Sequence, residues 1–178
     1  FPLFLATGDY HKIEPSRVAL SNAMNVGHPS NLARLFALYG GHIRETGQVA
    51  APPDLEAMRR DLWSVSIDDA ETRRVIRETW ETHRVMLEPH GAVGWAALLR
   101  WLEAGEPEEV EAVRAGRIPT VTLETAHPTK FPEAIVELTG VEPQTPPALE
   151  GLDSRPERWE PMRVDYPAFK AYGKERYG

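Results

Sequence analysis

The sequence predicts an α/β fold in which helices flank a parallel or mixed sheet. Short runs of β-branched and apolar residues alternate along the chain with segments of helical periodicity, an order typical of that class. The clearest junction spans residues 118–140, where a strand-like run up to Leu123 is followed by Pro128 and by a helix that begins at Thr129, its expected cap, and ends at Gly140. Open α/β sheets bind their ligands where a strand ends and a helix begins, so this corner is a candidate site.

The N-terminal part of the chain is predicted to alternate strands with helices. Leu32, Leu35 and Phe36 recur with helical spacing behind Pro29, which suits a first helical position, and Gly40 ends that helix. In order, the expected elements are a strand at 1–6, a strand at 18–24, the helix at 29–40, a brief helix at 55–62 and a strand at 63–67.

Two longer helices are predicted next. Asp68 and Glu71 have the spacing of a capping box and begin the first of them. Glu88 and Pro89 begin the second, whose apolar residues occur on nearly every side, so we expect it to be buried. Residues 106–116 are expected to form a short charged helix or a loop.

The composition changes after Gly140. Prolines interrupt a polar stretch that is not expected to form long regular structure, although residues 167–172 allow a short closing helix. We therefore predict a main domain at 1–140 and a Pro-rich tail at 141–178. The chain begins with Phe1 rather than Met, which we interpret as the start of a fragment.

Composition excludes several classes of partner. A net charge of −7 argues against nucleic acid and against anionic membranes, which would not attract the chain. The sequence has no cysteine, and its histidines are not spaced as metal ligands, so neither disulfides nor a metal site are expected. No apolar run approaches the length of a membrane span. We expect a cytoplasmic protein, or part of one.

Two groups of residues could carry chemistry. Glu124, Thr125 and His127 lie at the corner between the predicted strand at 118–123 and the following helix. Glu88 and His90 lie at the start of the buried helix, where a carboxyl and an imidazole form a candidate acid–base pair. The alternative for both groups is structural: an ordinary capped turn at 124–130, and an N-cap beside a structural histidine at 88–90.

Three motifs resemble threonine synthase. The first is Thr-Ala-His-Pro-Thr-Lys-Phe at 125–131. The second is Ser-Asn-Ala-Met-Asn-Val-Gly-His-Pro-Ser-Asn at 21–31, which is similar to the family's Ser-Asn-Ala-Met-Asp-Val-Gly-x-Pro-Ser-Asn. The third is Glu-Pro-His-Gly-Ala-Val-Gly at 88–94, where the family has Asp-Pro-His-Thr-Ala-Val-Gly. All three occur in the family's order.

This resemblance implies the C-terminal portion of a tryptophan-synthase-β-like, fold type II enzyme that uses pyridoxal 5′-phosphate (PLP). The substrate would be O-phospho-L-homoserine, which reacts with water to give threonine and phosphate. Thr125 matches the threonine that hydrogen-bonds the pyridine nitrogen, and Asn22, Glu88, His90 and His127 are possible lining residues of the pocket. The catalytic PLP lysine is expected upstream, in an N-terminal portion that acts as the partner of this one.

Departures from the family pattern leave other activities open. Gly91 stands where the family usually has Thr, Glu88 where it usually has Asp, and Asn25 where it has Asp. Lys130 belongs to the motif that contains Thr125 and is not expected to be the Schiff-base lysine. The alternatives to threonine synthase are a stand-alone small-molecule-binding domain and part of a related PLP-dependent deaminase or lyase.

Overall fold

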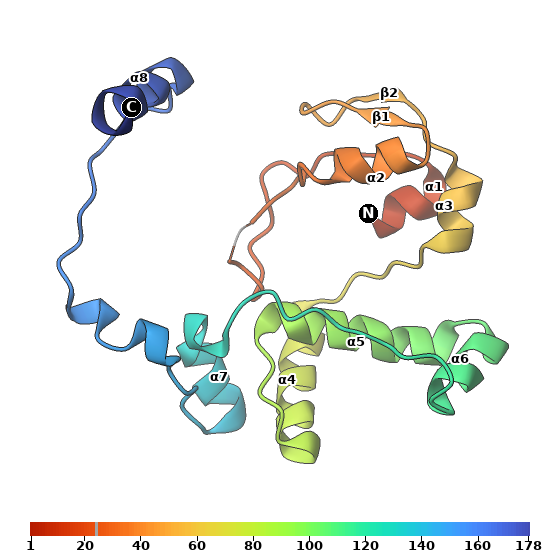
Figure 1. Cartoon of the computed structure of the whole chain (residues 1–178). Helices are drawn as coiled ribbons and strands as arrows, with labels where there is room; N and C mark the ends of the chain where they lie inside the picture. Colours follow the sequence, from red (N-terminus) through yellow and green to blue (C-terminus); the bar gives the residue numbers. More distant parts are fainter. Residues whose placement is uncertain (24) are drawn as a thin grey trace. The chain divides into compact units, whose positions relative to one another are not determined.

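Helices form most of the regular structure of the described residues, which are 1–23 and 25–178 of the computed structural model (Figure 1). The chain divides into two units, Phe1–Gln144 and Thr145–Gly178. The elements of the first unit are α1 (Pro2–Thr7), α2 (Leu32–Leu38), β1 (His42–Ile43), β2 (Val49–Ala51), α3 (Leu55–Asp61), α4 (Asp69–His83), α5 (Pro89–Ala104), α6 (Pro107–Arg114), the 3-10 turn η1 (Pro128–Lys130) and α7 (Pro132–Thr139).

The second unit has fewer elements. Two 3-10 turns, η2 (Pro147–Leu149) and η3 (Leu152–Ser154), precede the helix α8 (Tyr166–Tyr177). Asp165 caps α8 by accepting a hydrogen bond from the Ala168 amide at 3.4 Å. The short closing helix that the sequence predicts is therefore present and longer than expected. The assignment of residues 1–140 to the large domain of a PLP enzyme stays a prediction.

A first hydrophobic cluster, the α1–α3 cluster, joins helices α1, α2 and α3 to strand β1. The rings of Phe4 and Phe36 stack with centroids 4.9 Å apart, and Tyr10 meets both rings edge-on. The buried members of the α1–α3 cluster are Phe4, Leu5, Leu32, Phe36, Ile43 and Met58. Arg59 ties α3 to α1, because its side chain donates to the carbonyl oxygens of Leu5 and Ala6.

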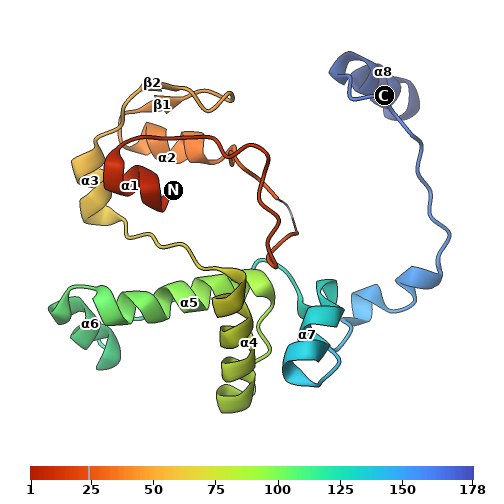
Figure 2. The ribbon, with the colours of Figure 1, turned by 180° about the vertical axis from the view of Figure 1, so that it is seen from behind.

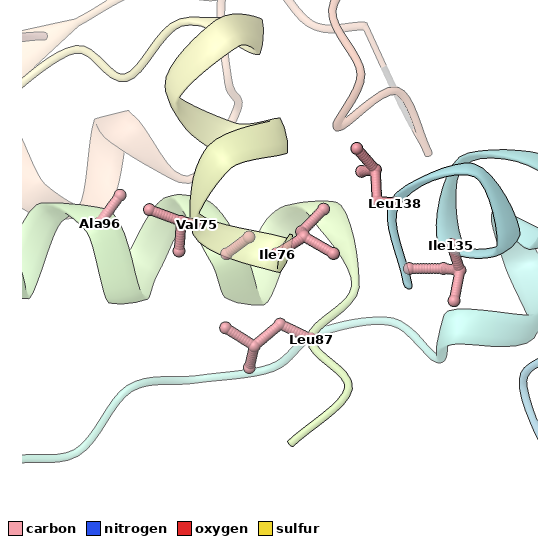
Figure 3. Close-up of a cluster of buried hydrophobic side chains, with 7 residues drawn as sticks. Val75, Ile76, Leu87, Ala96, Ile135 and Leu138 are labelled. Atoms are coloured by element: carbon pink, nitrogen blue, oxygen red, sulfur yellow. The ribbon is translucent and has the colours of Figure 1, made fainter. Parts of the chain in front are cut away.

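A second cluster, the α4–α5–α7 cluster, holds the three helices that carry the candidate site. Helix α4 packs against both α5 and α7, and it meets α5 near the first turns of α5 in both views (Figures 1 and 2). The buried members of this cluster are Val75, Ile76, Leu87, Ala92, Ala96, Ile135 and Leu138, most of which are labelled in Figure 3. The cluster thereby fixes the chain just before Glu88 and just after Phe131.

The predicted helix starts in this region are confirmed. Asp68 accepts a hydrogen bond from the Glu71 amide at 2.8 Å and caps α4. Glu88 caps α5, and Pro89 occupies its first position. Gly140 ends α7 with φ at 71°, the left-handed conformation that glycine adopts without strain. The helix predicted to begin at Thr129 begins instead at Pro132, after the separate turn η1.

The predicted parallel or mixed sheet is wrong for this chain. In the described part of the chain the sheet consists of the antiparallel hairpin β1–β2 alone, which the sequence did not indicate. Residues 1–6, predicted as a strand, lie in α1 instead, because Pro2 suits a first helical position and Gly8 supplies a left-handed cap with φ at 82°.

The other predicted strands run without a partner strand among the residues described. The segments 18–23, 63–67 and 118–123 contain no strand, and Met24 of the predicted strand 18–24 lies outside the described residues. Valine and isoleucine favour a strand only where a neighbouring strand can pair with them and cover one face. Val121 and Leu123 have no such cover and are 82% and 73% exposed.

A helix that crosses a membrane must be both long and apolar. Among the residues that the structure describes, no helix combines the length and the apolar character needed to cross a bilayer.

Candidate active site at the first turn of helix α5

The Glu88 side chain is fully buried and accepts three contacts at the first turn of α5. Its Oε1 atom accepts a hydrogen bond from the Gly91 amide at 2.8 Å. Its Oε2 atom accepts one from the His90 amide at 2.8 Å and lies 2.6 Å from Nδ1 of the His90 ring. The positive end of the helix dipole stabilises a negative charge at this position. The carboxylate is therefore both a helix cap and the partner of an imidazole.

His90 is held on two sides. Nδ1 contacts the carboxylate of Glu88, and the ring packs against Phe131 with centroids 5.5 Å apart at an interplanar angle of 51°. Its side chain is 23% exposed. Because an ionised carboxylate can only accept hydrogen bonds, Nδ1 carries a hydrogen and Nε2 is the nitrogen left for other partners.

Glu124 connects the segment at 124–131 to the start of helix α5. Its Oε1 atom accepts a hydrogen bond from the Glu88 amide at 2.6 Å, so residues 36 positions apart in the sequence meet at this turn. Gly91 makes room for that carboxylate, because a Cβ atom placed there would lie 3.0 Å from both Cγ and Cδ of Glu124. The predicted motifs at 88–94 and 125–131 are therefore neighbours in space.

Thr125 follows Glu124 directly and is exposed. Within the described ranges, no hydrogen bond engages its hydroxyl group. A threonine hydroxyl can both donate and accept, so Thr125 offers a neutral polar contact beside the turn that Glu88 and Glu124 form.

The His127 side chain contacts Thr129 within its own turn. Its Nδ1 accepts a hydrogen bond from the Thr129 amide at 3.2 Å and lies 2.8 Å from the Thr129 hydroxyl oxygen. His127 is therefore the N-cap of η1, and Thr129, which we expected to cap the following helix, is its partner. Lys130 is exposed in the same turn.

The segment that contains Asn22 is anchored to α4. The Leu20 amide donates to Oδ1 of Asp69 at 2.8 Å, and Leu20 packs on the α4–α5–α7 cluster that also contains Leu87 and Ala92. Asn22 is exposed, and its amide donates to the Leu20 carbonyl oxygen at 2.9 Å. This part of the motif thus reaches the cluster that supports Glu88, although no contact joins Asn22 to Glu88 in the described ranges.

The end of that motif contacts a different part of the chain. A Cβ atom at Gly27 would lie 1.8 Å from the Ile13 carbonyl oxygen, so this position excludes a side chain because the backbone passes close by. The sequence alone did not indicate this close approach. His28 has its Nδ1 atom 2.6 Å from the Tyr10 hydroxyl.

The comparisons with known proteins agree on one family. The family model described as "Threonine synthase, C-terminal" matches residues 91–172. Threonine synthase from Methylobacillus glycogenes is 37% identical over 178 residues, which cover 92% of this chain and 33% of that protein. The crystal structure of threonine synthase from Escherichia coli matches with a TM-score of 0.68 at 26% identity, over 98% of this chain and 34% of that chain.

This chain is homologous to the C-terminal region of threonine synthase. It spans about a third of the length of the relatives that it matches over most of its own length, such as threonine synthase-like 2 from Rattus norvegicus at 28% identity, with 88% of this chain and 33% of that protein covered. The PLP-bound threonine synthase from Brucella melitensis has the same fold, with a TM-score of 0.67 at 24% identity over 98% of this chain and 37% of that chain. The resemblance inferred from the three motifs is confirmed, as is the relation to part of a fold type II enzyme.

Sequence reasoning missed two contacts at this candidate site. The hydrogen bond from the Glu88 amide to Glu124 and the packing of Phe131 on His90 join positions that are far apart in the sequence. One signal could have pointed to the first contact. Gly91, in place of the family's usual threonine, leaves space at the helix start that a neighbouring side chain can fill.

Proposed function

We propose that this chain supplies the C-terminal region of a threonine synthase. This PLP-dependent carbon–oxygen lyase converts O-phospho-L-homoserine and water to L-threonine and phosphate. The proposal includes an N-terminal portion that carries the PLP lysine and the cradle for the cofactor phosphate. Lys130 is not that lysine in this proposal, because it lies in a short 3-10 turn within the motif that contains Thr125.

The observation that carries the proposal is the meeting of two family motifs at one turn. Glu88 and His90 come from the motif at 88–94, and Glu124 and Thr125 lie at the start of the motif at 125–131. The hydrogen bond between the Glu88 amide and the Glu124 carboxylate joins them directly. A buried carboxylate beside an exposed hydroxyl is the kind of arrangement that binding sites use.

The residues at this turn fit one edge of PLP. Both carboxylates are engaged by backbone amides, so the group left to meet the pyridine nitrogen is the neutral hydroxyl of Thr125. When bound, PLP would act as the electron sink for bonds broken at the substrate carbons. A hydroxyl partner, unlike an aspartate, leaves the ring nitrogen largely unprotonated and so limits that electron sink. In this proposal Thr125 therefore orients the ring and restricts side reactions.

The remaining residues of the turn hold this edge in place. Glu88 fixes the start of α5, Glu124 fixes the backbone just before Thr125, and Phe131 packs on the ring of His90. Residues held by packing and by outer hydrogen bonds keep the geometry that catalysis requires. The buried cluster behind them links this turn to α4 and α7.

The test uses the protein from the complete reading frame that contains residues 1–178. The purified protein should bind PLP and release threonine and phosphate in equal amounts from O-phosphohomoserine. Threonine and serine, offered as substrates in parallel, should give no more than traces of a keto acid. A protein that binds PLP and deaminates threonine or serine, with no threonine formed from O-phosphohomoserine, would contradict the proposal and favour a related deaminase.

A further inference from the structure

We infer that His90 is the proton-accepting residue of the reaction proposed above and that Glu88 is the positioning residue that orients it. The inference rests on the proposed function, because it assigns a step of that reaction. It goes further in naming which group of this chain takes a proton and which group holds it ready.

The hydrogens at the turn leave one nitrogen of His90 with a lone pair. Both oxygens of Glu88 already accept backbone N–H groups, and Oε2 also lies 2.6 Å from Nδ1 of His90. The carboxylate has no hydrogen to give, so Nδ1–H donates to it and the lone pair of the neutral ring is on Nε2. No hydrogen-bond partner of Nε2 is found among residues 1–23 and 25–178. The ring therefore presents a free base.

The orientation of the His90 ring is fixed by its neighbours. The ring is fixed at Nδ1 by a carboxylate that is itself completely buried, and one face is fixed by Phe131. A base that is held in one tautomer and one orientation by a carboxylate partner is a recurring arrangement for proton transfer. The side chain still keeps 23% of its exposure, so a small molecule can reach it.

The first turn of α5 is suited to proton transfer rather than to phosphate binding. A helix start attracts anions only while its amides are free. Here the amides of His90 and Gly91 already donate to Glu88, and the Glu88 amide donates to Glu124. Two carboxylates at the same turn repel a third anion. The turn is thus suited to accepting a proton from a neutral group rather than to holding the substrate's phosphate.

One covalent step follows for this chain. The O–H bond of a bound water breaks, its proton forms a bond to the lone pair of Nε2, and the hydroxide keeps the electron pair of the broken bond. That hydroxide forms the new carbon–oxygen bond at Cβ of a substrate that is double-bonded between Cα and Cβ. The π bond breaks, and its electron pair moves to Cα, where PLP would delocalise it when bound. The imidazolium then gives its proton to solvent, and Glu88 remains ionised throughout, so the charge it supplies stabilises the imidazolium while it exists.

The experiment compares variants of the complete PLP-bound protein. His90→Asn should lower kcat by about 10²–10⁴-fold, the range typical of losing a positioned base, while the visible absorbance of bound PLP stays unchanged. His83→Asn, an exposed histidine at the end of α4, is the matched control and should keep the wild-type rate.

The positioning role has its own test. Glu88→Asp, which introduces the family's usual residue, keeps a carboxylate and should retain most of kcat. Glu88→Gln keeps the size of the side chain but removes the charge, so it should lower kcat with little change in KM. Equal rates in the two variants would overturn the role of Glu88.

A chemical measurement on the wild-type protein covers the case in which a variant fails to fold. Diethyl pyrocarbonate should modify His90, identified by peptide mapping, in step with the loss of activity, and O-phosphohomoserine should slow that modification. Full activity with His90 modified, or a His90 that does not react while His83 does, would overturn the inference. If the wild-type protein makes no threonine at all, the proposed function fails instead, which the first assay distinguishes.

Discussion

Helices α5 and α8 are of similar length but are stabilised in different ways. Helix α5 buries Pro89, Gly91, Ala92 and Ala96 against its neighbours, and its cap is a buried carboxylate with bonds of 2.8 Å. Helix α8 buries no residue, and its cap is a single exposed bond of 3.4 Å. Its aromatic residues Tyr166, Phe169 and Tyr177 are 71%, 61% and 81% exposed.

The contrast shows which part of the chain has its structure fixed by packing. A helix of 12 residues without buried contacts is marginal in water, so α8 depends on local effects such as its cap and the ion pair between Arg176 and Glu160. The residues of α5 are held by the α4–α5–α7 cluster. The candidate active site lies on the helix that is rigidly packed, which is what a catalytic site requires.

The largest effect should come from the core behind α5. Ile135→Ala removes a fully buried side chain from the α4–α5–α7 cluster, so it should reduce the free energy of unfolding by about 2–5 kcal/mol. Phe169→Ala on α8 removes a larger side chain but should change that free energy by no more than about 0.5 kcal/mol. Urea unfolding of both variants measures the two values. Similar losses in the two variants would remove the distinction between the helices.

The two helix caps provide the second comparison. Glu88→Ala leaves the buried amide of Gly91, the partly buried amide of His90 and the His90 ring without an acceptor, and we expect a cost of about 2 kcal/mol. Asp165→Ala removes one long, exposed bond and should cost at most about 0.5 kcal/mol. Hydrogen exchange should show the same order, with fast exchange at the first turn of α8 in the wild-type protein. Slow exchange there would mean that α8 is packed against something else.

The smallest predicted effect concerns two ion pairs. Hydrogen bonding to Arg100 lowers the pKa of Glu71, and hydrogen bonding to Arg176 lowers the pKa of Glu160. A carboxyl whose pKa is lower in the folded state stabilises the fold above its unfolded pKa, and that stability is lost as the pH falls through the folded pKa.

The more buried of the two ion pairs should contribute more to the stability of the fold. The Glu71 side chain is 10% exposed and that of Glu160 is 56% exposed, so solvent screens the second pair more strongly. At neutral pH Glu71→Gln should destabilise the protein more than Glu160→Gln does, and the difference should disappear in acid. Thermal unfolding from neutral to acidic pH measures it, and equal melting temperatures for both variants at neutral pH would contradict this expectation.

The local signals in the sequence predicted part of this fold well. The caps at Asp68 and Glu88 and the stop at Gly140 depend on a few neighbouring residues, so the chain itself indicates them. The prediction of a strand at 118–123 was wrong because β-branched residues form a strand only beside a partner strand, and the pairing of strands is not a local property. The strand predicted at 1–6 proved to be helix α1, because an apolar run of six residues does not distinguish a helix from a strand.

The candidate site was predicted in its residues but not in its contacts. The family motifs identified Thr125, Glu88 and His90, and the chain brings the two segments together at the start of α5. No periodicity indicates that Glu124 reaches the Glu88 amide, because that contact depends on where the extended segment passes along α5 and on the space beside Gly91. His127, by contrast, is bonded to Thr129 within its own turn.

The most direct test of this account measures PLP binding when the Thr125 hydroxyl is removed. In the complete protein, Thr125→Val should cost one hydrogen bond of about 1–3 kcal/mol, or roughly five- to a hundredfold in the dissociation constant for PLP or in turnover. Thr129→Ala is the matched control and should leave PLP binding unchanged, because the Thr129 hydroxyl contacts His127. Titration of the apoprotein with PLP, followed by absorbance, gives both values. Wild-type affinity and spectrum in Thr125→Val, with a change in Thr129→Ala, would contradict the placement of the cofactor at this turn.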